Sequence, residues 1–181
     1  MIFRETALAG AYIVELEQYA DERGFFARSF CQEEFAAHGL QAAAAVAQCN
    51  ISFNRQQGTV RGMHFQLPPK AEAKLVRCTQ GALYDVIIDL RSDSPTYCHW
   101  FGVDLTAANH RALYIPEGFA HGFQTLEDDT EVFYQMFAFY SPEHAAGVCW
   151  DDPAFGISWP LPVSVIAPKD CSYPAYRKVG V

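Results

Sequence analysis

The chain lacks any uninterrupted apolar run of about 18 residues, the length that a helix needs to cross a bilayer. It also lacks a basic start followed by an apolar stretch and a small-residue cleavage site, so we expect no secretory signal. Basic residues are scarce, because 13 Lys and Arg stand against 21 Asp and Glu and leave a net charge of −8. This charge disfavours nucleic acids and membranes as partners, although a local basic site for a phosphate stays open.

The six cysteines form no C-x-x-C pair, the spacing that is typical of zinc and redox sites. An even number of cysteines could form disulfides in a secreted chain. Without a secretory signal, their spacing instead favours reduced thiols. We therefore predict a cytoplasmic protein.

The composition is that of an ordered globular chain, with 50% hydrophobic and 14% aromatic residues. At 181 residues it is most simply one domain, over residues 1–181. Short strand-like runs separated by turn residues predict an all-β sandwich or barrel. Helical signal is confined to "CQEEFAAHGLQAA" (31–43), with Gly39 near its end. From about Pro153, a proline-rich tail is expected to wrap the body as ordered coil.

Three segments carry the clearest strand patterns. "KLVRCTQGALYDVIIDLR" predicts two strands with a turn or bend at its central glycine. "HWFGVDLTAANHRALYIPEG" predicts a strand, a polar turn at 107–110 and a second strand that ends at Pro116. "TEVFYQMFAFYSPE" predicts a long strand of β-branched and aromatic residues, closed by Ser-Pro.

Two segments resemble the motifs of cupins, which are jelly rolls (double-stranded β-helices) that keep their ligands inside the barrel. "PEGFAHG" matches the P-x-G-x-x-H motif with His121, and "RGMHFQ" supplies His64. The slots that hold a second histidine and a glutamate in metal-binding cupins carry Gln66 and Lys74 here. An ammonium group repels a divalent ion, and two histidines are too few for a stable site. We predict no metal, which makes a metal-dependent cupin enzyme the weaker alternative.

His64 taken alone would more often be a packed core histidine than a functional one. Its expected neighbours reverse this preference, because Arg61, Lys74, His121 and Tyr134 all lie on segments that would line one barrel. Such an interior suits carbanion chemistry next to a ketone. His64 could remove the proton, since its pKa is ordinarily near neutrality, and Lys74 could stabilise the enolate charge.

Tyr134, on a different strand, could return a proton to the opposite face and so invert the carbon. On spacing alone it is as often a core residue, because its strand is rich in aromatic side chains. The interior chemistry therefore predicts an epimerase but leaves this alternative open. A binding protein without turnover is a further alternative, although simple binding does not require a base opposite an acid.

Several motifs, taken in order, resemble the dTDP-4-dehydrorhamnose 3,5-epimerases of bacterial deoxysugar biosynthesis over nearly the whole chain. The matching stretches are "DERGFF", "QCN", "RGMHFQ", "KLVRCTQGALYDVIIDLR", "YIPEGFAHGF", "YSPEHAAGVCWDDPAFGISWP" and "PKD". The resemblance implies a cupin jelly roll, a homodimer and no metal or organic cofactor. It also implies a nucleotide-diphosphate 4-keto-6-deoxy sugar as substrate.

The same resemblance implies roles for individual residues. His64 matches the catalytic base, Asp170 the carboxylate that orients it, Tyr134 the proton donor, and Lys74 the residue near the C4 oxygen. The residues that match contacts to sugar, diphosphate or nucleotide are Arg23, Phe26, Arg28, Gln48, Asn50, Arg61, His121, Glu143 and Lys169. Arg23 and its neighbours are expected to reach into the partner subunit's site. Without the resemblance, Asp170 and Arg23 would be interpreted as solvated turn residues.

Arg28 is the main departure from the family pattern, which commonly has a glutamate there. A carboxylate can accept a hydrogen bond from thymine N3–H, whereas arginine offers only donors, which suit the acceptors of cytosine better. The hypothesis is a shift of base preference toward CDP or another nucleotide. The alternative is that Arg28 points into solvent or pairs with a nearby acid such as Glu22.

Overall fold

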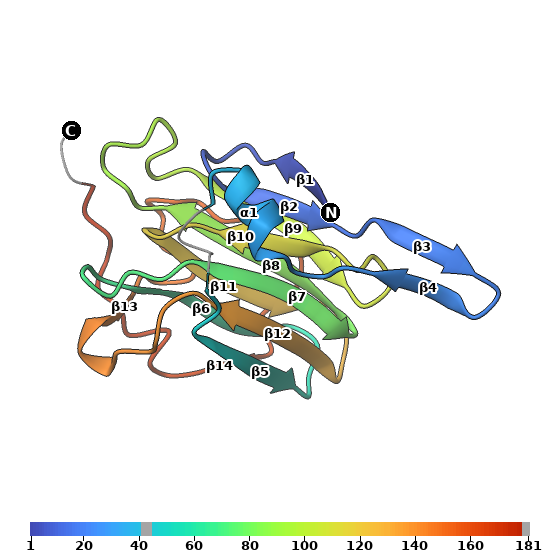
Figure 1. Cartoon of the computed structure of the whole chain (residues 1–181). Coiled ribbons are helices and arrows are strands. Elements are labelled where there is room, and N and C mark those ends of the chain that lie inside the picture. The colour runs from blue at the N-terminus through green and yellow to red at the C-terminus, as the bar shows by residue number, and fades with distance from the viewer. Residues whose placement is uncertain (41–44, 179–181) are drawn as a thin grey trace.

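Two antiparallel sheets face each other in the computed structural model, which describes residues 1–40 and 45–178 (Figure 1). The first sheet has the order β1 (Ile2–Glu5), β2 (Tyr12–Glu15), β10 (Ala112–Ile115), β7 (Lys74–Gln80), β12 (Thr130–Met136) and β5 (Gln48–Asn54). The second has the order β13 (Ala145–Gly147), β6 (Thr59–Gln66), β11 (Phe119–Thr125), β8 (Ala82–Asp89) and β9 (Trp100–Thr106). A short strand, β14 (Val165–Ile166), pairs parallel with β6. The predicted all-β, cupin-type jelly roll is confirmed.

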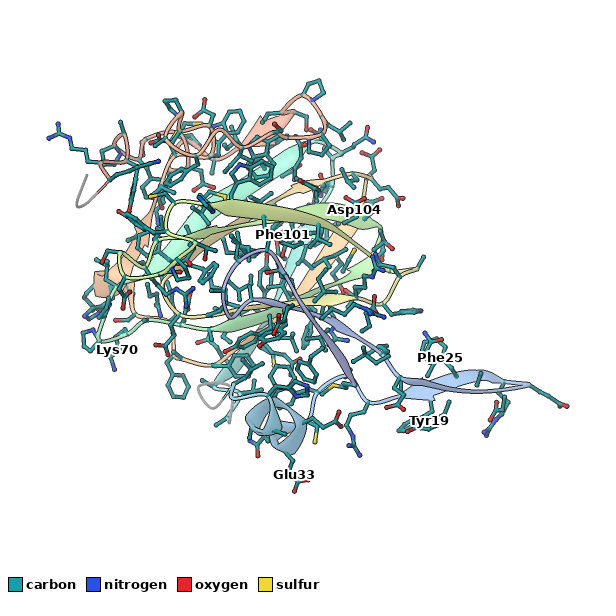
Figure 2. All side chains as sticks on the ribbon, turned by 90° about the horizontal axis from the view of Figure 1, so that it is seen from above. Tyr19, Phe25, Glu33, Lys70, Phe101 and Asp104 are labelled. Atoms are coloured by element: carbon teal, nitrogen blue, oxygen red, sulfur yellow. The ribbon has the colours of Figure 1, made fainter. Side chains whose placement is uncertain are left out.

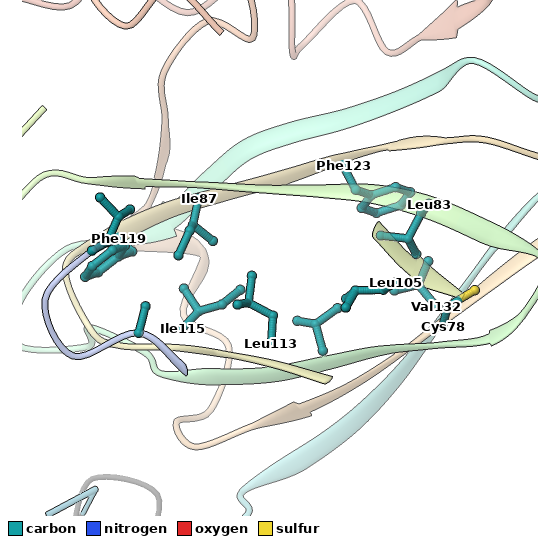
Figure 3. Close-up of a cluster of buried hydrophobic side chains, with 12 residues drawn as sticks. Cys78, Leu83, Ile87, Leu105, Leu113, Ile115, Phe119, Phe123 and Val132 are labelled. Atoms are coloured by element: carbon teal, nitrogen blue, oxygen red, sulfur yellow. The ribbon is translucent and has the colours of Figure 1, made fainter. Parts of the chain in front are cut away.

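The main core fills the space between the two sheets, where inward-facing side chains of both layers meet (Figure 3). Leu83, Ile87 and Phe123 come from the second sheet, and Leu113 and Val132 come from the first. Each of these side chains is at most 1% exposed. This contact closes one part of the barrel and leaves the polar residues of β5, β6 and β11 to line the other part.

Each sheet also has a covered outer face. The helix α1 (Gln32–Ala37) packs Phe35 against the first sheet beside Leu75 and Tyr114. Residues of the C-terminal tail, among them Phe155, pack against the second sheet. Because β11 is covered on both sides, all seven of its residues are buried. The proline-rich tail is therefore ordered against the body as expected, but it includes β14.

The turn predictions hold at the residue level. Gly81 has a φ of +74° and separates β7 from β8, which lie in different sheets, so the chain changes layer at this glycine. The strand predicted to reach Ser-Pro ends earlier, at Met136. The predicted helix is shorter than its pattern, and 41–43 of that pattern lie outside the described residues. Among the helices described, none is long and apolar enough to span a membrane.

A two-stranded hairpin, β3 (Gln18–Asp21) and β4 (Gly24–Ala27), extends away from the sheets (Figure 1; Figure 2). All residues of β3 and most of β4 are exposed. Large apolar side chains are included, with Tyr19 64%, Phe25 43% and Phe26 76% exposed. An isolated two-stranded hairpin has little stability in water, and exposed apolar side chains of this size are typical of an interaction surface. We therefore expect the hairpin to pack against another surface.

Candidate active site

A cavity of about 530 Å³ opens inside the barrel, between β5, β6, β7, β11, β12 and the C-terminal tail. Its walls are formed by polar and apolar side chains together, as is usual for small-molecule sites. Eight residues predicted for the site line it: Asn50, Arg61, His64, Lys74, His121, Tyr134, Lys169 and Asp170. The structure thus brings these distant segments of the chain to one interior.

An irregularity in strand pairing brings Arg61 and His64 into the same cavity. His121 pairs with His64 and Phe123 pairs with Arg61, so three steps along β6 face two steps along β11. A regular strand would point residues three apart to opposite faces, and the extra residue on β6 cancels this difference. The β-bulge therefore places a guanidinium and an imidazole on one wall.

His64 is paired with a buried carboxylate from the tail. Its Nε2 lies 2.7 Å from Oδ1 of Asp170, whose other oxygen accepts the Gly62 N–H at 3.2 Å. Asp170 is 4% exposed, so it is not the solvated turn residue that its local sequence indicates. Because a carboxylate only accepts, Nε2 of His64 carries the proton and Nδ1 keeps a lone pair. This tautomer is the one that a base requires.

Opposing effects set the pKa of His64. Burial lowers it most, the hydrogen bond and charge of Asp170 raise it, and the charges of Lys74 and His121 lower it further. The net pKa lies below the usual value of 6.5. His64 is therefore neutral at pH 7, with its lone pair available to accept a proton.

Lys74 carries its charge into the interior with a counterion that sequence reasoning missed. Its side chain is 7% exposed, and Nζ lies 3.0 Å from Oε1 of Glu72, which is 8% exposed. Nζ also donates to the backbone oxygen of His64 at 3.3 Å and so spans from β7 to β6. The only sequence signal for Glu72 is its position two residues before Lys74. Glu72 therefore supplies a counterion for this buried ammonium, which lies beside the base.

A second imidazole–carboxylate pair lies beside the first. Nε2 of His121 is 2.7 Å from Oδ1 of Asp85, which is fully buried on β8. The other oxygen, Oδ2, has no hydrogen-bond partner among the residues that the structure describes. Sequence reasoning missed Asp85, although an aspartate inside the apolar run "ALYDVIID" was a usable signal. The two pairs place two carboxylate-bound imidazoles on adjacent strands.

Tyr134 faces these imidazoles from β12 in the opposite sheet. Its ring lies 6.1 Å from the His121 ring at an interplanar angle of 71°. Burial raises the pKa of the Tyr134 phenol most, and the charge of Asp85 adds to this effect. The phenol is therefore fully protonated at pH 7 and can act only as an acid in that state.

Two cationic side chains, Arg61 and Lys169, also line the cavity. Nε of Arg61 donates to Oδ1 of Asn54 at 2.7 Å, which fixes the guanidinium, and its terminal nitrogens have no hydrogen-bond partner among the described residues. Lys169 is exposed on the tail, next to Asp170. Forked guanidinium donors match the oxygens of a diphosphate, and a lysine adds a point charge.

Two predicted residues, Gln48 and Glu143, do not line the cavity. Gln48 donates to Oδ1 of Asn50 at 3.3 Å and accepts from the backbone N–H of Tyr140 at 3.0 Å. Glu143 lies in the short 3₁₀ helix Pro142–His144 and accepts a hydrogen bond from Ser141. Gln48 therefore contacts a residue that lines the cavity, whereas Glu143 forms its hydrogen bond within its own turn.

The remaining predicted residues lie on or beside the hairpin, away from this chain's own cavity. Arg23 pairs with Asp21 and its side chain is 89% exposed, and Phe26 is exposed on β4. Arg28 donates to Oε1 of Glu34 at 2.7 Å. Glu22, which the sequence suggested as its acidic neighbour, is not that partner. The guanidinium of Arg28 thus has an acceptor within its own chain.

The cupin metal slots do not form a ligand set here. Gln66 uses its amide on backbone groups, donating to Lys70 and accepting from Ser141. Within residues 1–40 and 45–178, no three His, Cys, Asp or Glu side chains group closely enough to hold a metal. His64 and His121 each direct one ring nitrogen to a carboxylate, and an ammonium occupies the remaining slot. The residues present do not fit a divalent ion.

The fold and this cavity define a cupin-like protein in which imidazole–carboxylate pairs, an ammonium and a phenol face one another. The chain belongs to the dTDP-4-dehydrorhamnose 3,5-epimerase family, whose sequence model matches residues 5–178. The resemblance seen in the sequence motifs is thereby confirmed.

Known members of this family are similar to the chain over nearly its full length. The dTDP-4-dehydrorhamnose 3,5-epimerase of Sinorhizobium fredii is 44% identical, with 100% of this chain and 92% of that one covered. The solved epimerase of Bacillus anthracis, with TDP and PPi bound, is 42% identical at a TM-score of 0.91 and covers 97% of this chain and 99% of that one. ChmJ, a 3'-monoepimerase from Streptomyces bikiniensis, is 31% identical at a TM-score of 0.84, with 94% and 85% covered.

Proposed function

We propose that this protein is an isomerase that inverts C3, C5 or both in a dTDP-linked 4-keto-6-deoxyhexose. The observation that carries the proposal is one cavity with a carboxylate-oriented base, His64, and a neutral phenol, Tyr134, on opposite sheets. The relatives' names support the substrate class. One of them, from Legionella pneumophila, was solved with dTDP-4-keto-L-rhamnose and is 36% identical at a TM-score of 0.86.

The reaction begins with proton removal next to the ketone. Nδ1 of His64 takes the proton from C3 or C5, and the electron pair of that C–H bond moves into the enolate, whose charge lies on the C4 oxygen. Asp170 stabilises the imidazolium that forms, and Lys74 stabilises the enolate oxygen. No electron leaves the substrate, so no redox cofactor is required.

Inversion follows when the proton returns from the other side. The phenol of Tyr134 gives its proton to the same carbon on the face away from His64, and the enolate electron pair forms the new C–H bond. The phenolate then recovers a proton from solvent, while the imidazolium releases its own. The net change is the configuration of one carbon, and repetition at the second carbon would give a 3,5-epimerisation.

The rest of the nucleotide sugar would extend from this centre toward the cavity mouth. Arg61 and Lys169 supply positive charge for the diphosphate, and His121 lines the sugar region. Gln48 and Asn50 on the edge strand β5 offer amide groups to the nucleobase, and we assign Glu143 to the nucleotide or sugar contacts on the family resemblance. Six cysteine thiols are free, and we place this activity in the cytoplasm, where thiols stay reduced.

We further propose a homodimer in which each β3–β4 hairpin completes the partner's site. The hairpin carries Arg23 and exposed aromatic side chains away from its own cavity. Strand β5 is an edge strand beside the cavity and exposes Ile51 at 64% and Phe53 at 47%. An exposed apolar edge strand has backbone groups that can pair with a strand of another chain, and the hairpin of a second copy can supply such a strand.

The test is incubation of EDTA-treated protein with dTDP-4-keto-6-deoxyglucose in D2O, with deuterium counted at C3 and C5 by NMR. Deuterium at both inverted carbons would establish a metal-free 3,5-epimerase, and deuterium at one carbon a monoepimerase such as the name of ChmJ describes. The CDP-linked sugar, run in parallel, tests the hypothesis on Arg28. Absence of exchange with both sugars would overturn the proposal.

A further inference from the structure

The inner face of β5 carries a row of polar side chains along the cavity. Asn50, Ser52 and Asn54 alternate with outward-facing residues, as the two-residue period of a strand requires. Asn54 is 3% exposed and fixed by its amide, which donates to the backbone oxygen of Thr130 at 3.1 Å. Ser52 lies between the two asparagines and is not one of the groups that transfer a proton in the proposed reaction.

Strand register brings Ser52 close to the Tyr134 side chain. Ser52 pairs directly with Val132 on β12, and Tyr134 follows two residues later on the same face. Diagonal neighbours of this kind lie within reach of a long aromatic side chain. Ser52 and Tyr134 both line the cavity. The hydroxyl and the phenol therefore belong to one wall of the site.

The Ser52 hydroxyl is free to turn. Its contact with Oδ1 of Asn54 is long, at 3.5 Å, and the same oxygen already accepts the Arg61 Nε–H at 2.7 Å. The short bond from a charged donor holds that oxygen, so Asn54 competes only weakly for the serine proton. In agreement, burial raises the pKa of the Tyr134 phenol most, and the Ser52 hydroxyl acts against this effect by lowering that pKa.

We propose that Ser52 is a positioning residue for proton return by Tyr134. In the resting state its oxygen accepts the phenol O–H and aims the phenol. After Tyr134 has given its proton to the carbon, the Ser52 O–H turns and donates to the phenolate, without breaking its own O–H bond. A hydroxyl both accepts and donates, so one side chain serves both states. This inference rests on the proposed function.

The test separates proton removal from inversion. Ser52→Ala is compared with wild type in D2O, following deuterium at the reacting carbon and the change of configuration independently. With the phenol impaired, the enolate is more often reprotonated from the face of His64, which exchanges hydrogen without inversion. We expect the ratio of inversion to exchange to fall about 10- to 100-fold, the worth of one hydrogen bond to a charged group.

Two further variants guard against a merely structural effect. Ser52→Thr keeps the hydroxyl and should restore the ratio, whereas Ser52→Cys keeps the size with a weak hydrogen-bonding group and should behave like Ser52→Ala. An unchanged ratio in Ser52→Ala and Ser52→Cys variants that turn over would overturn the inference alone. A wild type without exchange would overturn the proposed function and the inference together.

Discussion

The imidazole of His64 and the carboxylate of Asp170 lie 2.7 Å apart although their positions in the chain differ by 106. The same carboxylate also accepts the backbone N–H of Gly62, so a single side chain ties the C-terminal tail to β6 and orients the imidazole. The geometry makes the tail part of the site and not only a cover for the sheet.

Asp170→Asn should lower kcat by about 100- to 10,000-fold, because the base loses its tautomer and the support of its imidazolium. It should also shift the acid limb of kcat/KM. Asp170 raises the pKa of His64, so its loss lowers that pKa further and the limb moves to lower pH. The pH dependence of the residual activity checks this prediction.

Asp152→Asn is the matched control. Asp152 is also 4% exposed and also holds the tail, through the backbone N–H of Tyr176 at 2.6 Å, but it does not touch His64. It should cost stability and leave the acid limb in place. If the two variants shifted the limb equally, the link between Asp170 and the His64 proton would be wrong.

Substitutions in the Lys74–Glu72 pair should affect stability and activity differently, because the second substitution restores only stability. Lys74→Met leaves a carboxylate buried without its cation, which should cost about 3–5 kcal/mol of unfolding free energy. The double variant with Glu72→Gln should recover most of that stability, because the lone charge is gone. Turnover should stay lost in both, since the enolate oxygen has no cation. Urea unfolding and deuterium exchange measure the two effects, and an active double variant would exclude this role for Lys74.

Gly62 and Gly24 have similar positive φ angles but different surroundings. Alanine substitutions at the two positions therefore distinguish the cost of backbone strain from the cost of a steric clash. Gly62 has a φ of +136°, and a Cβ there would meet Cα of Gly122 at 2.5 Å, where β6 and β11 touch. Gly24, at the start of β4, has a φ of +124° with nothing within 4 Å. Gly24→Ala should cost about 1–2 kcal/mol from backbone strain alone.

Gly62→Ala should cost several kcal/mol more than Gly24→Ala, because the backbones of two central strands must move apart. It should also displace the neighbouring His64 and lower turnover. Thermal unfolding of the two variants side by side provides the measurement. Equal losses would show that β6 and β11 can relax without cost.

Local sequence patterns predicted most of the fold because alternation and glycine turns act within a few residues. They also predicted the cavity walls, since His64 and His121 stand in recognisable motifs. Asp85 and Glu72 were missed because their importance depends on which side chain they face, and Asp85 lies 36 residues from His121. The irregular tail has no period, so the placement of Asp170 was expected from the family resemblance alone.

The proposal that each hairpin completes the partner's site can be tested by mixing two inactive variants. Arg23→Ala and His64→Ala should each be nearly inactive as homodimers, if Arg23 serves the partner's cavity. A mixed dimer would combine one intact cavity with the intact hairpin of its partner. Unfolding and refolding an equal mixture should therefore recover about a quarter of wild-type activity, since half of the dimers are mixed and each has one working site.

A mixture of His64→Ala with Lys74→Ala serves as the control. Both of these residues line the cavity of their own chain, so every mixed dimer has two defective sites and no activity should return. Recovery only in the mixture with Arg23→Ala would place the hairpin in the neighbouring subunit's site. If neither mixture recovered, Arg23 would act within its own chain. The exposed aromatic side chains of β3 and β4 would then need another surface to cover them.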